Sequence, residues 1–308
     1  MNKFLISLLL SLSFPQLVGA QDLPTDSICQ NWTSAEVIGT LPNSNFPEVS
    51  GMIASPNIPG RLYLINDSGD GPYFYSYDLP SGDFEKVEIS GFKGWDIEAI
   101  SFGPCGSNRS CVFIGDIGDN QGQRKIIRIA AVVEKERYGS KVRPLFHKVL
   151  SYPDGGKDSE AFVISQAGDL YLFSKEAGWV GSNPTKVYNL SSTELRQKSK
   201  STLKKLGEFD LYNSIKTPFL KVTDAALSSD QTRLFLLGYF GSYELDFQEL
   251  VEKLQGSKVA QIENYVSVGT GFVQQNEAAT YTPDGESIIW TYESKSSPAP
   301  LLQKTCLK

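Results

Sequence analysis

The sequence predicts an all-β protein, a five-bladed β-propeller closed by a strand from near the N-terminus. Three observations predict this fold. Five segments share one pattern, further strand-like segments follow each of them, and one strand-like segment before the first copy has no place in a copy. Internal repeats of this length are typical of propellers. A six-bladed ring is the alternative, because two of the intervals between copies exceed 60 residues.

The repeated pattern is an acid or hydroxyl, a small residue, a hydrophobic residue, a turn and an apolar strand. The copies are EVSGMIASPNIPGRLYLIND from Glu48, DIEAISFGPCGSNRSCVFIGD from Asp96, DSEAFVISQAGDLYLFSKE from Asp158, VTDAALSSDQTRLFLLGY from Val222 and NEAATYTPDGESIIWTYES from Asn276. A third strand follows every copy, and a fourth follows the first four. We therefore expect one four-stranded blade per copy, with insertions such as the helix-prone SSTELRQKSKSTLKK from Ser191 in the longer intervals.

The fifth copy lacks a fourth strand, and the N-terminal segment SAEVIGTLP can supply it. The cysteines support this closure. Cys29 lies just before that segment and Cys306 lies at the end of the fifth copy's third strand, so antiparallel pairing would bring the two together. Cys105 and Cys111 bracket a turn. The predicted disulfides are therefore Cys29–Cys306 and Cys105–Cys111.

The first 20 residues are typical of a secretory signal peptide. Lys3 precedes a short apolar run, and a small-residue pattern ends at Ala20. This run is too short to span a membrane, and no later stretch reaches the required length. We expect an exported protein, secreted or periplasmic, without membrane insertion. Residues 21–308 would then form one monomeric propeller domain, in a compartment where disulfides persist.

Charge and histidine content exclude several function classes. The net charge of −6 and pI near 5.1 argue against a nucleic-acid partner, whose phosphates require a basic patch. The single histidine, His147, excludes Ser-His-Asp and Cys-His catalysis and zinc sites with several histidines. Any chemistry must therefore depend on carboxylates, hydroxyls, amides and a few basic side chains.

One oxygen-bearing residue per copy would line the channel of the predicted propeller. Aligned on the small residue, these are Ser50, Glu98, Glu160, Asp224 and Glu277, separated by 48, 62, 64 and 53 residues. The first strand of each blade lines the channel, so the five would form a ring at one mouth. Clustered carboxylates repel one another unless a cation lies among them. Such hard ligands favour Ca²⁺ over Mg²⁺ or a transition metal. The alternative is that these residues only hydrogen-bond the turns between blades.

The loops after the second strands would open on the same mouth. They contribute Asn66, Asp67 and Asp70 from blade one, Asp116, Asp119, Asn120 and Arg124 from blade two, and Lys175, Glu176, Tyr239 and Glu293 from the others. Turn formation alone explains Asn, Asp and Gly in such loops. The concentration of polar residues in two neighbouring blades instead predicts a functional rim of Asp67, Asp116, Asp119 and Arg124. An acidic mouth with isolated basic residues suits a small anionic ligand bridged by the metal.

The strand starts EVSG, GFKGWDIEA, DSEA, TDAA and NEAA, together with LYLINDSGDGPYFY, resemble those of the calcium-activated nucleotidases, or secreted apyrases. The resemblance implies a five-bladed propeller with one channel calcium, held here by Ser50, Glu98, Glu160 and Glu277. Asp224 stands where that family has a second Ser. The turn Asn66-Asp67-Ser68-Gly69-Asp70 lacks the Arg of the family's Asp-Asp-Arg-Thr-Gly. GDIGDN with YPDG…EA is also similar to exported bacterial propeller proteins of unassigned activity.

Three function classes fit these residues. The first is a Ca²⁺-dependent hydrolase of phosphoanhydride or phosphoester bonds, in which Asp67 or Asp116 orients water and a basic residue, Arg124 or Lys175, holds charge. The second is a glycoside hydrolase, which ranks lower because the ring offers no distinguished acid–base pair. The third is a non-enzymatic module with structural calcium that binds a protein or glycan. The fold alone cannot decide among them.

Overall fold

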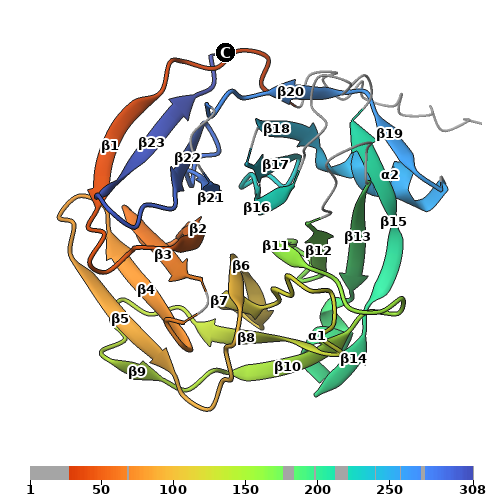
Figure 1. Ribbon diagram of the computed structural model, residues 1–308, viewed down its shortest axis with the longest axis horizontal. Helices are drawn as coiled ribbons and strands as arrows, with labels where there is room; N and C mark the ends of the chain where they lie inside the picture. Colours follow the sequence, from red (N-terminus) through yellow and green to blue (C-terminus); the bar gives the residue numbers. More distant parts are fainter. Residues whose placement is uncertain are drawn as a thin grey trace, which may run out of the picture.

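The computed structural model describes residues 28–67, 69–175, 184–197, 199–211, 221–239, 241–256, 258–271 and 275–307. Five sheets stand around one axis as blades, which confirms the five-bladed propeller (Figure 1). The predicted signal peptide and Glu176 lie outside the described residues. Among those residues, no helix is both long enough and apolar enough to cross a membrane.

Each blade is a meander of four antiparallel strands that runs outward from the axis. Blade one contains β2 (Val49–Ala54), β3 (Arg61–Asn66), β4 (Tyr73–Asp78) and β5 (Phe84–Ile89). Blade two contains β6 (Ile97–Gly106), β7 (Arg109–Asp116), β8 (Ile127–Val133) and β10 (Phe146–Ser151). Blade three contains β11 (Ser159–Ile164), β12 (Leu170–Ser174), β13 (Thr185–Leu190) and β15 (Lys204–Leu211).

Blades four and five complete the ring. The two ends of the chain pair within blade five, and this junction is called the seam below. Blade four contains β16 (Val222–Leu227), β17 (Arg233–Gly238), β18 (Gly241–Asp246) and β20 (Tyr265–Ser267). Blade five contains β21 (Asn276–Tyr281), β22 (Ser287–Tyr292), β23 (Ala299–Thr305) and the N-terminal β1 (Glu36–Leu41). The pairing of β1 with β23 is antiparallel, so the N-terminal strand completes the fifth blade as predicted.

Both predicted disulfides are present. Cys29 and Cys306 join the two ends of the ring with a Cα–Cα distance of 5.9 Å, and Cys105 and Cys111 close the β6–β7 turn. The buried carboxylate of Glu244 also fastens the seam, because it accepts hydrogen bonds from the Cys29 amide and the Tyr281 hydroxyl. The seam is therefore held by a covalent bond, a strand pair and a buried carboxylate.

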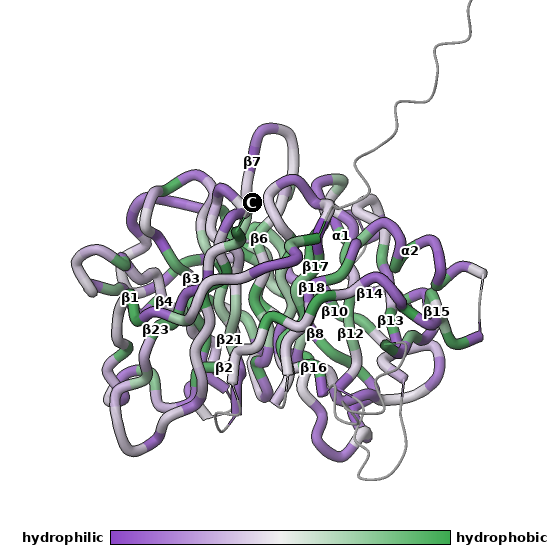
Figure 2. The backbone as a smooth tube through the Cα atoms, turned by 90° about the horizontal axis from the view of Figure 1, so that it is seen from above, coloured by the Kyte–Doolittle hydropathy of each residue, from purple (hydrophilic) through white to green (hydrophobic). Residues whose placement is uncertain are grey.

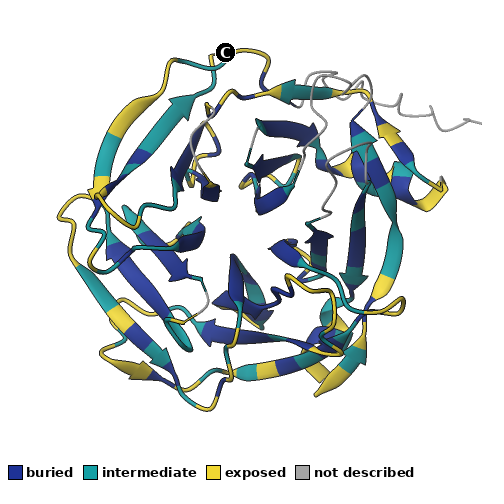
Figure 3. Cartoon of the chain, viewed as in Figure 1, coloured by how far each residue is buried: buried dark blue, intermediate teal, exposed yellow. Residues whose placement is uncertain are grey.

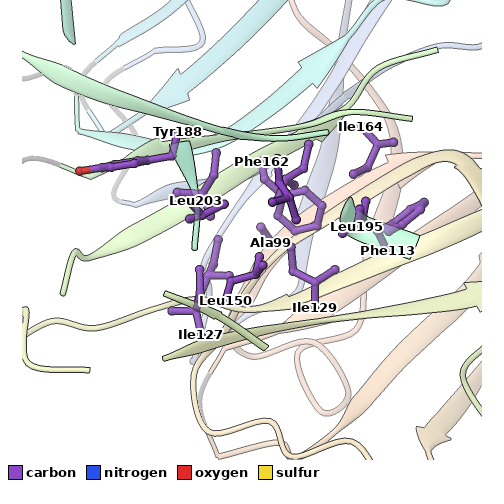
Figure 4. Packing of buried hydrophobic residues seen from close by; sticks show 14 of the residues in the cluster. Ala99, Phe113, Ile127, Ile129, Leu150, Phe162, Ile164, Tyr188, Leu195 and Leu203 are labelled. Atoms are coloured by element: carbon purple, nitrogen blue, oxygen red, sulfur yellow. The ribbon is translucent and has the colours of Figure 1, made fainter. Parts of the chain in front are cut away.

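The core consists of apolar layers between neighbouring blades. All six residues of β11 are buried, as expected for a strand covered on both faces. Innermost strands are largely buried and exposed residues lie toward the periphery (Figure 3). Hydrophobic stretches follow the strands, whereas hydrophilic stretches gather in the projecting loops (Figure 2). One such layer joins blades two and three around Phe113 and Phe162 (Figure 4).

Short parallel strands extend three of the blades. They are β9 (Lys141–Val142) on β5, β14 (Lys200–Thr202) on β10 and β19 (Ala260–Ile262) on β15. Each comes from a segment later in the chain than the blade it joins. The fourth strand expected after the fourth copy falls on KVAQIENYVSV from Lys258. As a single strand this prediction is wrong, because the segment supplies β19 to blade three and β20 to blade four.

Within the described part of the chain, two helices lie in the connections. The predicted helix-prone insertion forms only the short α1 (Ser192–Gln197) before β14 begins. The second helix, α2 (Phe247–Gly256), does not follow from the repeat pattern. Asp246 caps this helix by accepting a hydrogen bond from the Glu249 amide at 2.8 Å, and Phe247, Leu250 and Leu254 form its buried face.

Candidate metal centre and rim

Every innermost strand carries a β-bulge at the same place. The pairing register skips one residue in each of β2, β6, β11, β16 and β21. The skipped residues are Ser50, Glu98, Glu160, Thr223 and Glu277. A bulge leaves its extra residue out of the ladder and redirects its side chain. The repeat thus places one oxygen-bearing side chain per blade at an equivalent position.

The alignment of Asp224 with the ring is wrong by one residue. The register shift in β16 makes Thr223 the equivalent of Ser50, and their hydroxyls behave alike. Ser50 Oγ donates to the Ile97 carbonyl at 3.0 Å, and Thr223 Oγ1 donates to the Asn276 carbonyl at 2.7 Å. Each bond runs to the next blade, at the residue before that blade's glutamate. The ring therefore consists of two hydroxyls and three glutamates.

Asp224 occupies the position that Gly51 has in blade one. Its carboxylate is wholly buried and accepts hydrogen bonds from the amides of Ala225 at 2.8 Å, Ala279 at 2.8 Å and Met52 at 3.4 Å. These bonds link the innermost strands of blades four, five and one. Burial raises the pKa of Asp224 well above its usual range, although the three amide donors oppose the shift.

The other four predicted ring residues converge on one pocket at the channel mouth. The pocket has a volume of about 160 Å³. Its lining includes Ser50, Glu98, Glu160, Glu277, Asp67, Asn120, Lys175 and Tyr239. The three glutamates are at most 8% exposed. The structure thus brings together carboxylates from three different blades, as the repeat predicted.

The ring glutamates are costly to ionise in this pocket. Burial, followed by the nearby Glu160, raises the pKa of Glu98 and of Glu277 well above the usual range. Burial also raises the pKa of Glu160 to about 7, although Lys175 opposes the shift by donating a hydrogen bond to its Oε1. Lys175 donates to Tyr239 as well, at 2.7 Å. Glu160 Oε2 is buried and has no hydrogen-bond partner among the residues that the structure describes.

A second group of carboxylates adjoins the ring at Glu98. Asp67, Asp96 and Glu98 each offer an oxygen, and these oxygens lie within 4.8 Å of one another. The backbone of Gly118 packs directly against this group. A larger residue at this position would place its Cβ 2.6 Å from Asp96 Oδ2 and 2.7 Å from Glu98 Cγ, which is too close. Burial and the Asp67 charge raise the pKa of Asp96. Asp67 is among the residues singled out from the sequence, whereas Asp96 is not, although GFKGWDIEA places it just before the second strand start.

Three of the four predicted rim residues, Asp116, Asp119 and Arg124, form hydrogen bonds with one another. Asp116 is wholly buried, and its Oδ2 accepts from Arg124 at 2.7 Å and from Arg128 at 3.1 Å. Asp119 accepts a bond from the Arg124 amide at 2.6 Å. The Arg124 guanidinium also donates to the Gly118 carbonyl at 2.6 Å. These contacts hold the blade-two loop in shape, whereas Asp67 alone of the four lines the ring pocket.

The ring suits a hard divalent cation. Three carboxylates and the Ser50 hydroxyl line its pocket, and Glu160 Oε2 has no hydrogen-bond partner among the described residues. Thr223 is wholly buried and is not among the lining residues. Calcium prefers oxygen ligands of this kind and tolerates irregular geometry. Lys175 supplies one positive charge to the same pocket. The carboxyl groups of the three ring glutamates and Asp67 outnumber this single basic group. These oxygen donors are of the kind that calcium binds, and Lys175 is a neighbour that a bound cation would repel. The carboxylates whose oxygens lie within 4.8 Å of one another are those of Asp67, Asp96 and Glu98.

No protein-family model matches the chain, and no curated protein sequence matches it. Similar solved structures include the soluble aldose sugar dehydrogenase of Escherichia coli in its apo form, at 12% identity over 90% of this chain and 100% of that one, with a TM-score of 0.49. The PQQ domain of pyranose dehydrogenase from Coprinopsis cinerea matches at 10% identity over 83% and 81% of the chains, with a TM-score of 0.48. A luciferin-regenerating enzyme matches at 11% identity over 89% and 95%, with a TM-score of 0.46.

Similarity at this level does not transfer an activity. The molecule belongs to the class of five-bladed β-propellers with a carboxylate-lined channel mouth, which its own sheets and bulges define. Its relation to the calcium-activated nucleotidases stays a prediction from the strand-start motifs.

Proposed function

We propose that this protein is an exported β-propeller that binds one Ca²⁺ in its channel mouth and hydrolyses phosphoanhydride or phosphoester bonds there. The observation that carries the proposal is the shared bulge, which presents an oxygen ligand from all five blades. These ligands are Ser50, Glu98, Glu160, Thr223 and Glu277. Thr223 supports the resemblance to the nucleotidases, because it supplies a hydroxyl where that family has its second Ser.

Calcium, when bound, supplies positive charge that neutralises the ring and attracts an anionic ligand to an acidic mouth. The chain's own residues then have separate tasks. Asp67 lines the same pocket, and a carboxylate is a hydrogen-bond acceptor, so we assign it to orient a water molecule. Lys175 lies between Glu160 and Tyr239 and holds a positive charge close to the ligand. Arg124 and Asp116 position the blade-two loop.

The metal site is tested by thermal and chemical unfolding in calcium and in chelator. Free calcium at a hundred times its dissociation constant should stabilise the protein by about 2.7 kcal/mol, because the unfolded chain lacks the site. E160Q and T223V should each weaken calcium binding. E136Q is the matched control, since Glu136 is exposed. D224N should bind calcium as the parent does if the ring contains Thr223. An unchanged melting temperature in calcium would exclude the site.

A second function, a binding module with structural calcium, is favoured by one observation. Asp116 and Arg124, two of the predicted rim residues, are bonded to each other rather than presented to the pocket. Phosphate release from nucleotides and simple phosphoesters, measured with calcium and with chelator, separates the two functions. Calcium-dependent release that D67N abolishes supports the hydrolase. Calcium binding without any release supports the module.

A further inference from the structure

The opposite mouth of the channel holds a second cavity. The ring residues lie at the starts of the innermost strands, whereas this cavity lies toward their ends, so the two open at opposite faces of the propeller. Its volume is about 330 Å³, which is within the usual range for small-molecule sites. All five blades line it, through Ala54 of β2, Phe102 of β6, Ile164 of β11, Leu227 of β16 and Thr280 of β21.

The two mouths differ in charge. None of the described residues that line the second cavity is charged, whereas three glutamates line the ring pocket. Asp230 and Asp284 lie in the turns around the second mouth. Each accepts a hydrogen bond within its own turn, from the Ser228 and Thr282 hydroxyls respectively. The cavity therefore offers no partner for a charged ligand.

Apolar side chains form much of the cavity wall and reach solvent there. Ile53, Phe102 and Leu227 pack against the core clusters between blades, yet each stays partly exposed. Pro104 of the β6–β7 hairpin also lines the cavity, and the Cys105–Cys111 disulfide closes that hairpin. A wall that is already fixed binds a ligand with little further loss of conformational freedom.

Hydrogen-bond donors without acceptors also line this cavity. The hydroxyls of Ser101 and Ser165 each accept a bond from a backbone amide at 3.1 Å, but neither donates to an acceptor among the described residues. Gln231 Oε1 accepts a bond from the Gln166 amide at 3.0 Å, which ties blade four to blade three. A side-chain amide also has two N–H donors, and the Gln231 Nε2 group donates to no described residue. The cavity thus supplies donors that an acceptor oxygen on a ligand can use.

We propose that this mouth binds a small uncharged molecule with an apolar body and a carbonyl or ether oxygen. The apolar body would contact Ile53, Phe102 and Leu227, and the oxygen would accept a hydrogen bond from Gln231 Nε2. An ion would lose its hydration in this cavity without gaining a partner, whereas an uncharged molecule avoids that cost. The proposal does not depend on the proposed calcium or on the hydrolase, which concern the other mouth.

Fluorescence titration of the intact protein with Prodan tests this site. Prodan is an uncharged naphthalene with a propionyl carbonyl, and its emission responds to apolar surroundings and to hydrogen bonding. Chelator in the buffer keeps calcium out of the measurement, and we expect saturable binding. L227D places a charge in the cavity and should weaken this binding about tenfold. V37D is the matched control, since Val37 is 64% exposed on β1, and it should bind Prodan as the parent does.

Two further variants separate loss of binding from loss of folding. S229W fills the mouth from an exposed turn position, so it should weaken Prodan binding without adding charge. Q231E keeps the oxygen that accepts from the Gln166 amide but removes the N–H donors, so it should also weaken binding. A melting temperature equal to that of the parent shows that a variant is folded.

Three results would overturn the proposal. If Prodan does not bind saturably, or if L227D and S229W bind it as the parent and V37D do, the mouth is not a ligand site. If the anionic 8-anilinonaphthalene-1-sulfonate binds with the same dependence on Leu227, the mouth does not select uncharged ligands. If sedimentation shows that the parent self-associates and L227D does not, the mouth is an interface between copies of this chain.

Discussion

Two buried carboxylates with basic partners, Asp116 and Glu160, have very different surroundings. Asp116 accepts from two arginines and from the amides of Trp95 and Asp96, so both of its oxygens are occupied. Glu160 accepts a hydrogen bond from Lys175 through one oxygen, and its other oxygen has no partner in the described part of the chain. A buried charge is tolerated where the protein supplies every bond it needs. Asp116 therefore maintains the structure of its loop, whereas Glu160 keeps one oxygen available to the proposed calcium.

The largest expected effect is that of removing Asp116. D116A leaves two arginines without their shared carboxylate and should destabilise the protein by about 3–5 kcal/mol, the usual cost of breaking a buried ion pair. Denaturant unfolding measures the loss, with D83A as the control because Asp83 is exposed. If D116A unfolds like the parent but loses ligand binding, the contrast fails and Asp116 belongs to the functional site.

The disulfide at the seam should affect stability without affecting the ring. Replacing both Cys29 and Cys306 by Ser should cost about 3 kcal/mol, because the bond constrains nearly the whole unfolded chain. The calcium-induced stabilisation should keep its size, since the ring residues lie on the innermost strands. Melting curves of the double variant in calcium and in chelator give both quantities. A lost calcium response would show that the seam shapes the mouth.

Glu244 is a third buried carboxylate and should show the smallest effect. It accepts bonds from the Cys29 amide, Tyr281 and Arg233, yet burial raises its pKa in the folded protein. A carboxyl group whose pKa is higher in the folded state stabilises the fold most at a pH below its unfolded pKa of about 4.3. This stabilisation is lost as the pH rises through the pKa of the folded state. E244Q leaves one donor unmatched and should cost about 1–2 kcal/mol.

The pH dependence checks this assignment. Glutamine does not titrate, so the stability advantage of the parent over E244Q should be larger at pH 5 than at pH 8. Urea unfolding of both proteins at the two pH values measures the difference. An advantage that instead grows with pH would mean that the ionised carboxylate is the favoured form.

Much of the fold could be predicted because a propeller repeats one local pattern. The five blades, the closing strand and both disulfides follow from the spacing of strand starts and cysteines. Thr223 was missed because TDAA places an acid before a small residue, as DSEA and NEAA do. The β-bulge that places Thr223 at the ring position depends on how the strands pair, and no residue type in the sequence indicates it.

The rim shows a different limit. Asp116, Asp119 and Arg124 were correctly placed in one loop region, but their mutual bonds depend on how the loop folds over Asp158 and Gly118. Polar residues look alike in a sequence whether they bind a ligand or one another. The contacts of Arg124 and Arg128 with the Trp95 ring likewise depend on the folded loop and are not visible in the sequence.

The short strands β9, β14 and β19 have a consequence for how copies of this protein meet. An exposed outer strand offers unpaired amides and carbonyls to any other chain, which is a common route to aggregation. In blades one, two and three, a strand of only two or three residues covers that outer edge. So short a strand leaves little length for a neighbouring molecule to pair with. These connections therefore protect a concentrated solution of the protein from edge-to-edge assembly.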